Sequence, residues 1–197
     1  FAQKHGQRDK LTVLYSGNLG AIHDLETILA AAKHLQYLKN IHFLIIGEGF
    51  KKKFVAKYIN SNNLTNVTLL PLQPEVVLPY SLATGDVAVV SLIKGAEKLS
   101  FPSKVFYAMA SGAAILCICA KESDLWTLVE RHKCGICVEP GDIDGCIYAI
   151  MKFYEDKNFL VYCRRNARKA IEIHYNIERN IKHYLDAINH VITAQEE

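Results

Sequence analysis

The chain contains 197 residues, 50% of them hydrophobic and 22% charged, a balance typical of a globular protein. Its formal net charge of +3 is too small, and its lysines are too scattered, to indicate nucleic-acid binding. No apolar run reaches the roughly 18 residues of a membrane span, and residues 1–10 are too polar for a signal peptide. Because the chain does not begin with Met, we expect a fragment in which residues 1–10 are a linker from a missing N-terminal domain.

Short apolar runs alternate with helical patterns from residue 11 to residue 156, which we expect to form one domain. The apolar runs predict six strands, over residues 11–16, 41–47, 66–71, 86–92, 113–120 and 134–140. The helical patterns cover residues 23–38, 50–63, part of 74–85, 102–111, 122–133 and 142–156. This alternation predicts an α/β fold, a Rossmann-like parallel six-stranded sheet with helices on both faces.

Two further helices, 159–175 and 177–192, follow with no strand between them. We expect this tail, residues 157–197, to pack on or across the domain.

Ligands of such sheets bind at the edge where the strands end, near the point where the strand order reverses. Right-handed crossovers place every strand-to-helix loop at that edge. The candidate loops are residues 17–22, 47–50, 71–74, 92–101, 120–122 and 140–142.

The six cysteines mostly have apolar neighbours, which favours buried free thiols in a cytoplasmic protein. Cys134 and Cys137 form a CxxC pair, but no second pair and no His pair lies at zinc-finger spacing. We therefore favour two thiols that line the core over a metal or redox site.

Two glycine-rich loops follow the first two strands. Gly17 and Gly20 would let the backbone approach a ligand, and the next helix would offer N–H donors to an anion. Their spacing is GxxG and not the GxGxxG of dinucleotide-binding proteins, so a simple tight turn explains them equally well. Gly47, Glu48 and Gly49 repeat the pattern after the second strand.

The segment "FPSK" precedes an amphipathic helix. Pro102 suits a first helical turn, so we expect Ser100 or Phe101 to be the cap and the amides of residues 103–105 to lack helical partners. Those amides and the Lys104 charge predict an anion site at the ligand-binding edge, after a loop that is long enough to be functional. The alternative is an ordinary capped helix with Lys104 on the surface.

The order of six motifs resembles the C-terminal domain of GT-B glycosyltransferases. The motifs are "YSGNLG", "FLIIGEG", "NVTLLP", "DVAVVSL", "PSKVFYAMASG" and "CGICVEPGD". The nearest resemblance is to the retaining family-4 group, in the branch that carries PSK motifs and builds bacterial surface polysaccharides. It covers residues 10–156 and implies that this half binds a nucleotide-sugar donor. A glycan or lipid-linked acceptor would then bind the missing N-terminal half.

The resemblance assigns the first glycine-rich loop, with Gly17, Asn18 and Gly20, to the donor diphosphate. Many relatives hold the diphosphate with an Arg and a Lys in this region. This chain has Asn18 and His23 there, so Lys104 is the natural substitute.

Further donor contacts follow from the other motifs. Gly47, Glu48 and Gly49 match the loop after the second strand. The segment 71–73, with Leu72 and Gln73, matches the backbone that reads the base.

At the PSK helix, Phe101, Pro102, Ser103 and Lys104 match the start that binds the diphosphate. Many relatives carry two glutamates near this helix, separated by seven intervening residues, one for the donor sugar and one for the ribose. Leu99 and Tyr107 stand at those places, and the nearby Glu97 is the candidate replacement for the first glutamate.

The resemblance also implies the chemistry. A nucleoside diphosphate leaves from the donor, and the helix start with Lys104 stabilises its charge, so neither a divalent metal nor another cofactor is required. We expect a UDP-linked donor, no transfer by this fragment alone, and a cytoplasmic enzyme whose association with the inner membrane face would be peripheral.

Two other classes compete with this interpretation. A non-catalytic nucleotide-binding module would explain the missing acidic pair and the missing Arg. An NAD-dependent oxidoreductase would have the acidic Glu48 after the second strand but lacks the GxGxxG spacing.

Overall fold

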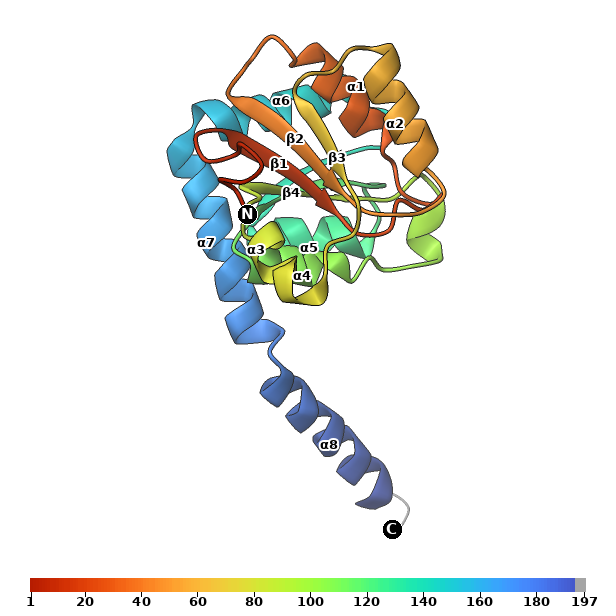
Figure 1. The fold of residues 1–197 in the computed structure, drawn as a ribbon. Coiled ribbons are helices and arrows are strands. Elements are labelled where there is room, and N and C mark those ends of the chain that lie inside the picture. Colours follow the sequence, from red (N-terminus) through yellow and green to blue (C-terminus); the bar gives the residue numbers. More distant parts are fainter. Residues whose placement is uncertain (194–197) are drawn as a thin grey trace.

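The computed structural model describes residues 1–193 and shows one α/β domain with a helical tail (Figure 1). The strands are β1 (Leu11–Ser16), β2 (Ile41–Ile46), β3 (Val67–Leu70), β4 (Val87–Ser91), β5 (Ala114–Ile118) and β6 (Gly135–Val138). The helices are α1 (Glu26–His34), α2 (Lys52–Ser61), α3 (Leu78–Leu82), α4 (Lys104–Ala110), α5 (Asp124–His132), α6 (Ile143–Glu155), α7 (Lys157–His174) and α8 (Ile177–Thr193). Two 3₁₀ turns, η1 (Glu75–Val77) and η2 (Ala96–Lys98), precede α3 and α4.

The six strands form one parallel sheet in the order β3-β2-β1-β4-β5-β6. This confirms the Rossmann-like fold class predicted from the alternating pattern. The strand order reverses between β1 and β4, which makes the ends of these two strands the expected ligand site. Their pairing is short, with Val13 opposite Val87 and Leu14 opposite Ala88, whereas β1 and β2 pair along their whole length.

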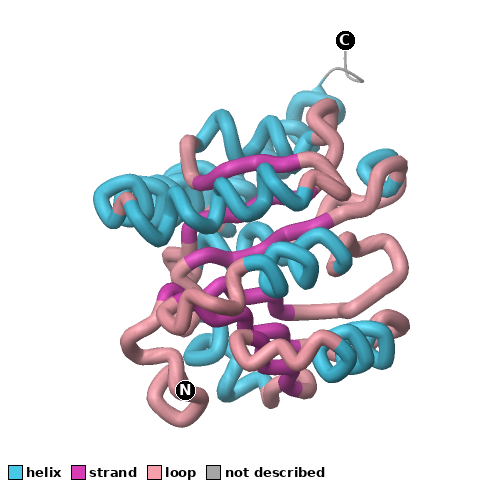
Figure 2. The backbone as a smooth tube through the Cα atoms, turned by 90° about the horizontal axis from the view of Figure 1, so that it is seen from above, coloured by secondary structure: helices cyan, strands magenta, loops and turns pink. Residues whose placement is uncertain are grey.

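Helices cover both faces of the sheet because every strand is apolar on both sides (Figure 2). On one face α1, α2 and α6 pack over a core that includes Phe43 and Phe153. On the other face α4 and α5 pack over a core that includes Val90 and Met109. Leu82 of α3 packs against a small cluster of Leu14, Leu44 and Ile46.

The cysteines are free thiols, five of them buried and Cys137 half-buried. Cys134 and Cys137 lie at the core on the α5 face, as expected for thiols that line it. No helix in residues 1–193 is long and apolar enough to cross a membrane.

The two tail helices differ from one another. α7 packs against α4, α6 and β5 and buries Leu160, Cys163 and Ala167. α8 extends away from the domain, and its described side chains are exposed (Figure 1). The expectation that the whole tail packs on or across the domain therefore does not hold for α8 within this chain. An amphipathic pattern predicts a helix with one apolar face but does not specify which surface covers that face.

Candidate functional site

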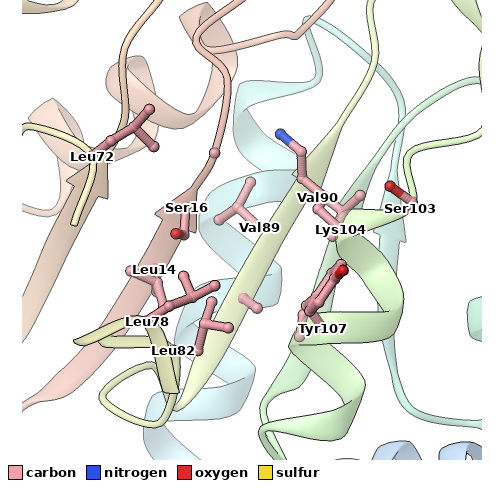
Figure 3. Close-up of a pocket in the computed structure, with 13 residues that line it drawn as sticks. Leu14, Ser16, Leu72, Leu78, Leu82, Val89, Val90, Ser103, Lys104 and Tyr107 are labelled. Carbon is pink, nitrogen blue, oxygen red and sulfur yellow. The ribbon is translucent and has the colours of Figure 1, made fainter. Parts of the chain in front are cut away.

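A cavity of about 310 Å³ opens where the strand order reverses. Its walls come from the ends of β1 and β4, the segment before α3, α3 itself and the first turns of α4 (Figure 3). The lining residues are Leu14, Ser16, Gly17, Leu72, Leu78, Leu82, Ala88, Val89, Val90, Ser103, Lys104, Tyr107 and Ala108. The volume lies at the lower end of the range for small-molecule sites, roughly 300–1,000 Å³.

The cavity has an apolar part and a charged part. Figure 3 shows Leu14, Leu78 and Leu82 gathered at one end, while the Lys104 amino group lies over Val90 near the ends of β1 and β4. This distribution suits a ligand with a flat apolar moiety joined to an anionic one.

Lys104 reaches from the first residue of α4 to the end of β1. Its Nζ donates a hydrogen bond to the Tyr15 hydroxyl at 2.7 Å and lies 4.1 Å from the centroid of that ring. Burial lowers the pKa of Lys104 to about 8, because a desolvated ammonium loses hydration energy. The site therefore holds a cation that begins to lose its proton just above neutral pH.

Tyr15 was not identified from the sequence, where it belongs to an apolar strand. The side chain is 1% exposed, and its hydroxyl donates to the Asn18 carbonyl at 2.7 Å. Burial raises the pKa of Tyr15 well above its usual value, so the phenol stays neutral. A hydroxyl near the carboxyl end of a predicted buried strand is the signal that could have found it.

The start of α4 differs from the expected cap. Ser103 is the N-cap, not Ser100 or Phe101, and Pro102 lies outside the helix. The Val105 amide donates to the Pro102 carbonyl at 3.1 Å, so the prediction of three free amides is wrong for this residue. The tight first turn makes this bond. The amides of Ser103 and Lys104 have no hydrogen-bond acceptor within the described chain.

The first glycine-rich loop passes beside Lys104 at Gly17. Gly17 has a φ of +134°, and a Cβ at this position would lie 3.6 Å from the Lys104 Nζ. Gly17 lines the cavity, whereas Asn18 is exposed and contributes its carbonyl to Tyr15. A Cβ on Gly20 would lie 3.0 Å from the Asn18 side-chain amide, so this glycine leaves room for Asn18.

The second glycine-rich loop supports the first and does not line the cavity. A Cβ on Gly47 would overlap the Gly17 carbonyl oxygen, and a Cβ on Gly49 would overlap the Asn18 side chain. Glu48 lies between them and forms an ion pair with Lys52. Gly47 and Gly49 are required because the two loops lie so close together that a side chain would not fit between them. The sequence motif alone does not show whether such glycines make room for a neighbouring loop or for a ligand.

His23 lies beside the site in a neutral form. Its Nδ1 is 2.8 Å from the Ser91 carbonyl, which can only accept, so Nδ1 carries the proton. Burial and the nearby Lys104 charge lower the pKa of His23. His23 does not line the cavity. As a neutral side chain, it supplies no positive charge in place of the Arg and Lys that hold the diphosphate in many relatives.

Several expected residues lie at the rim or outside. Leu72 and Tyr107 line the cavity and are both more than half exposed, whereas the Gln73 side chain donates to the Pro71 carbonyl. Phe101 stacks on the Phe106 ring outside the cavity.

Glu97 also lies outside the cavity lining. In η2 its carboxylate accepts from the Gly95 amide at 2.7 Å, and it borders a separate surface hollow with Ser123. Its position follows from the 3₁₀ turn, which residue spacing along a loop cannot predict.

The apolar wall of the cavity was not predicted from the sequence. Leu78 and Leu82 are four residues apart on α3 and line the cavity together. Their helical spacing was visible, but nothing in the sequence placed α3 beside the end of β1.

Residues 1–170 match the protein family described as "Glycosyl transferases group 1". The chain belongs to this family. Among curated relatives of this glycosyltransferase chain, WcaI of Escherichia coli K12 is 31% identical over 143 residues, covering 72% of the chain and 35% of WcaI. WbjE of Pseudomonas aeruginosa is 28% identical over 137 residues, covering 68% of the chain and 34% of WbjE. Both carry provisional names, WcaI as a colanic acid biosynthesis glycosyl transferase and WbjE as a glycosyltransferase.

The glycosyltransferase fold is also seen in solved structures. HepE of Anabaena, in complex with UDP and glucose, aligns with a TM-score of 0.80 at 15% identity, over 95% of this chain and 50% of HepE. TarM of S. aureus, in a complex that contains UDP, aligns with a TM-score of 0.74 at 19% identity, over 90% of this chain and 35% of TarM. The chain thus spans about a third of the length of the curated relatives it matches. Membership of this family argues against the alternative prediction that the chain is a domain of an NAD-dependent oxidoreductase.

Proposed function

We propose that residues 11–156 form the donor-binding domain of a retaining, family-4-like GT-B glycosyltransferase and hold a UDP-linked sugar. The observation that carries the proposal is the half-buried Lys104 cation at the charged end of a mostly apolar cavity, where the strand order reverses. UDP in the HepE and TarM structures supports the choice of nucleotide.

The cavity accounts for each part of such a donor. The base would lie against Leu78 and Leu82, with the Leu72 segment along its edge. The diphosphate would approach the Lys104 ammonium, which has no ion-pair partner in residues 1–193. Gly17 lets the loop backbone come close to the phosphates because it lacks a side chain.

The reaction would break the bond between the sugar and the diphosphate. Negative charge develops on the departing UDP, and a fixed cation together with preorganised amides stabilises it. Lys104 and the free amides of Ser103 and Lys104 can supply this stabilisation with no metal ion. Lys104 is therefore the proposed catalytic residue, and Glu97 keeps that role only if the loop 92–101 rearranges when donor binds.

The acceptor would bind a second domain that precedes residue 1. We propose a glycan or lipid-linked acceptor in bacterial surface polysaccharide synthesis, and the colanic acid biosynthesis in the name of WcaI supports a role in polysaccharide synthesis. Such an acceptor would bring the enzyme, which we propose to be cytoplasmic, to the inner face of the membrane. The chain by itself should bind donor and not transfer sugar.

A second candidate is a nucleotide-binding module without catalytic activity. It is favoured by the uncharged Leu99 and Tyr107 and by the position of Glu97 outside the cavity. Sugar transfer by the full-length protein separates the two candidates.

The first test is a calorimetric titration of the chain with UDP, GDP, ADP and NAD. We expect saturable binding of UDP, weakened at least tenfold in Lys104→Met, because a charged hydrogen bond contributes about 1.5–3 kcal/mol. Lys57→Met is the matched control, since Lys57 is exposed on α2. UDP binding that Lys104→Met leaves unchanged, or binding of NAD alone, would contradict the proposal.

A further inference from the structure

The Tyr15 hydroxyl connects two elements that are distant in the sequence. It lies 2.7 Å from the Asn18 carbonyl in the loop after β1 and 2.7 Å from the Lys104 Nζ on α4. A buried hydroxyl is costly unless it is hydrogen-bonded, and here both of its hydrogen-bonding roles are used.

The direction of both hydrogen bonds follows from chemistry. A carbonyl oxygen only accepts and an ammonium group only donates, so the phenol proton points to Asn18 and a phenol lone pair points to Lys104. The hydroxyl therefore cannot turn to another partner without losing one of these bonds. Its orientation, and with it the position of the ammonium, is set by the loop.

Tyr15 is the only protein acceptor within hydrogen-bonding distance of the Lys104 Nζ in residues 1–193. Without it, a long side chain on an apolar wall would turn its ammonium toward solvent. A carboxylate in this place would hold Lys104 equally well but would cancel its charge. A neutral phenol orients the ammonium, preserves the full positive charge and leaves the other two N–H groups for a ligand.

We propose that Tyr15 is a positioning residue that holds the Lys104 ammonium, charged and aimed at the donor diphosphate, by a hydrogen bond from the end of β1. This inference rests on the proposed donor site for its ligand, but the contact between Tyr15 and Lys104 stands by itself. Tyr15 acts through Lys104 and does not touch the donor.

The proposal makes a specific statement about protonation. Burial already lowers the pKa of Lys104 to about 8, and the groups that face its ammonium are the neutral Tyr15 phenol and His23. Removing an acceptor that bonds to the charged form lowers the pKa further. In Tyr15→Phe the ring and its packing remain, while the acceptor for Lys104 and the hydrogen bond to the Asn18 carbonyl are both lost.

The test is an NMR titration of Lys104 in the ligand-free chain, in wild type and Tyr15→Phe. We expect the pKa of Lys104 to fall by about one unit in Tyr15→Phe. Tyr58→Phe on α2 is the matched control and should leave the pKa of Lys104 unchanged. An unchanged pKa in Tyr15→Phe would overturn the proposal whether or not the chain binds UDP.

A UDP titration of the same proteins tests the consequence for binding. At pH 7.5 we expect Tyr15→Phe to weaken UDP binding about three- to tenfold, and to have no further effect in a Lys104→Met background. An equal loss in both backgrounds would show that Tyr15 acts by another route and would overturn the proposal. Failure of wild type to bind UDP would refute the donor site alone, because the NMR titration tests the Tyr15 contact separately.

Wild-type protein offers a second measurement if Tyr15→Phe does not fold. A slowly exchanging Lys104 ammonium signal with a cross-peak to the Tyr15 hydroxyl proton would support the contact. A rapidly exchanging ammonium with no such cross-peak would contradict it.

Discussion

The charge on Lys104 depends on the cavity that surrounds it. An exposed lysine stays protonated to about pH 10.4, whereas burial lowers the pKa of Lys104 to about 8. The attraction between this ammonium and an anionic ligand is strong, because little water competes for either charge. The lowered pKa also makes the charge of Lys104 depend on pH between about 7 and 9.

UDP binding should therefore weaken as the pH rises. The charged fraction of a lysine with a pKa of about 8 falls roughly tenfold between pH 7 and pH 9, so we expect a loss of affinity of about that size. The phosphates of UDP are already ionised in this range, because their second pKa is about 6. Calorimetric titrations at several pH values would measure the effect. Lys104→Met should bind weakly and with no such dependence, and an equal decline in that variant would contradict the assignment.

At the scale of elements, the two glycine-rich loops act as one unit. The Gly17 amide donates to the Ile46 carbonyl, the Leu19 amide donates to the Glu48 carbonyl, and Gly47 faces the Gly17 carbonyl at backbone distance. The loop after β2 thus sets the position of the loop that carries the Asn18 carbonyl, and through Tyr15 the position of Lys104.

Gly47→Ala should disturb this unit. The new methyl group would overlap the Gly17 carbonyl oxygen, and we expect a loss of about 1–3 kcal/mol in the free energy of unfolding together with weaker UDP binding. Gly20→Ala is the control in the same pair of loops, because its methyl group would meet only the flexible Asn18 side chain. Chemical denaturation would measure both variants. Equal free energies of unfolding for Gly47→Ala and Gly20→Ala would show that the two loops can move apart without loss of stability, which would contradict the prediction.

At the scale of the whole molecule, the proposed donor site would form one wall of a reaction site. The cavity is open at the carboxyl edge of a single sheet, and the chain spans 35% of the length of WcaI. A transfer reaction needs an acceptor held against the donor sugar, and positioning of two reactants provides a large part of enzymatic rate enhancement.

We expect the chain alone to bind UDP and to transfer no sugar from a UDP-linked donor, whereas the full-length protein transfers it. A radiolabelled donor with extracted lipid and glycan acceptors would measure both. Transfer by residues 1–197 alone would contradict the proposal that a second domain binds the acceptor. Donor binding without transfer by the full-length protein would favour the non-catalytic module.

The sequence by itself determined the sheet, the helices and the region of the site, because these follow from local patterns. Apolar runs of strand length, helical periodicity and the "PSK" segment act over a few residues, and parallel alternation then leaves one edge for ligands. The bounds of β1 were predicted to the residue, and the last strand, predicted over residues 134–140, is Gly135–Val138.

Only the tertiary structure decided which side chains meet at that edge. Tyr15 and Lys104 are 89 residues apart in the chain, and their contact depends on how β1 and α4 are placed across the short β1–β4 pairing. The same dependence explains why Gly47 contacts a loop, why Glu97 lies outside the cavity and why α8 leaves the domain. Local patterns specify elements, whereas packing between distant elements specifies a site.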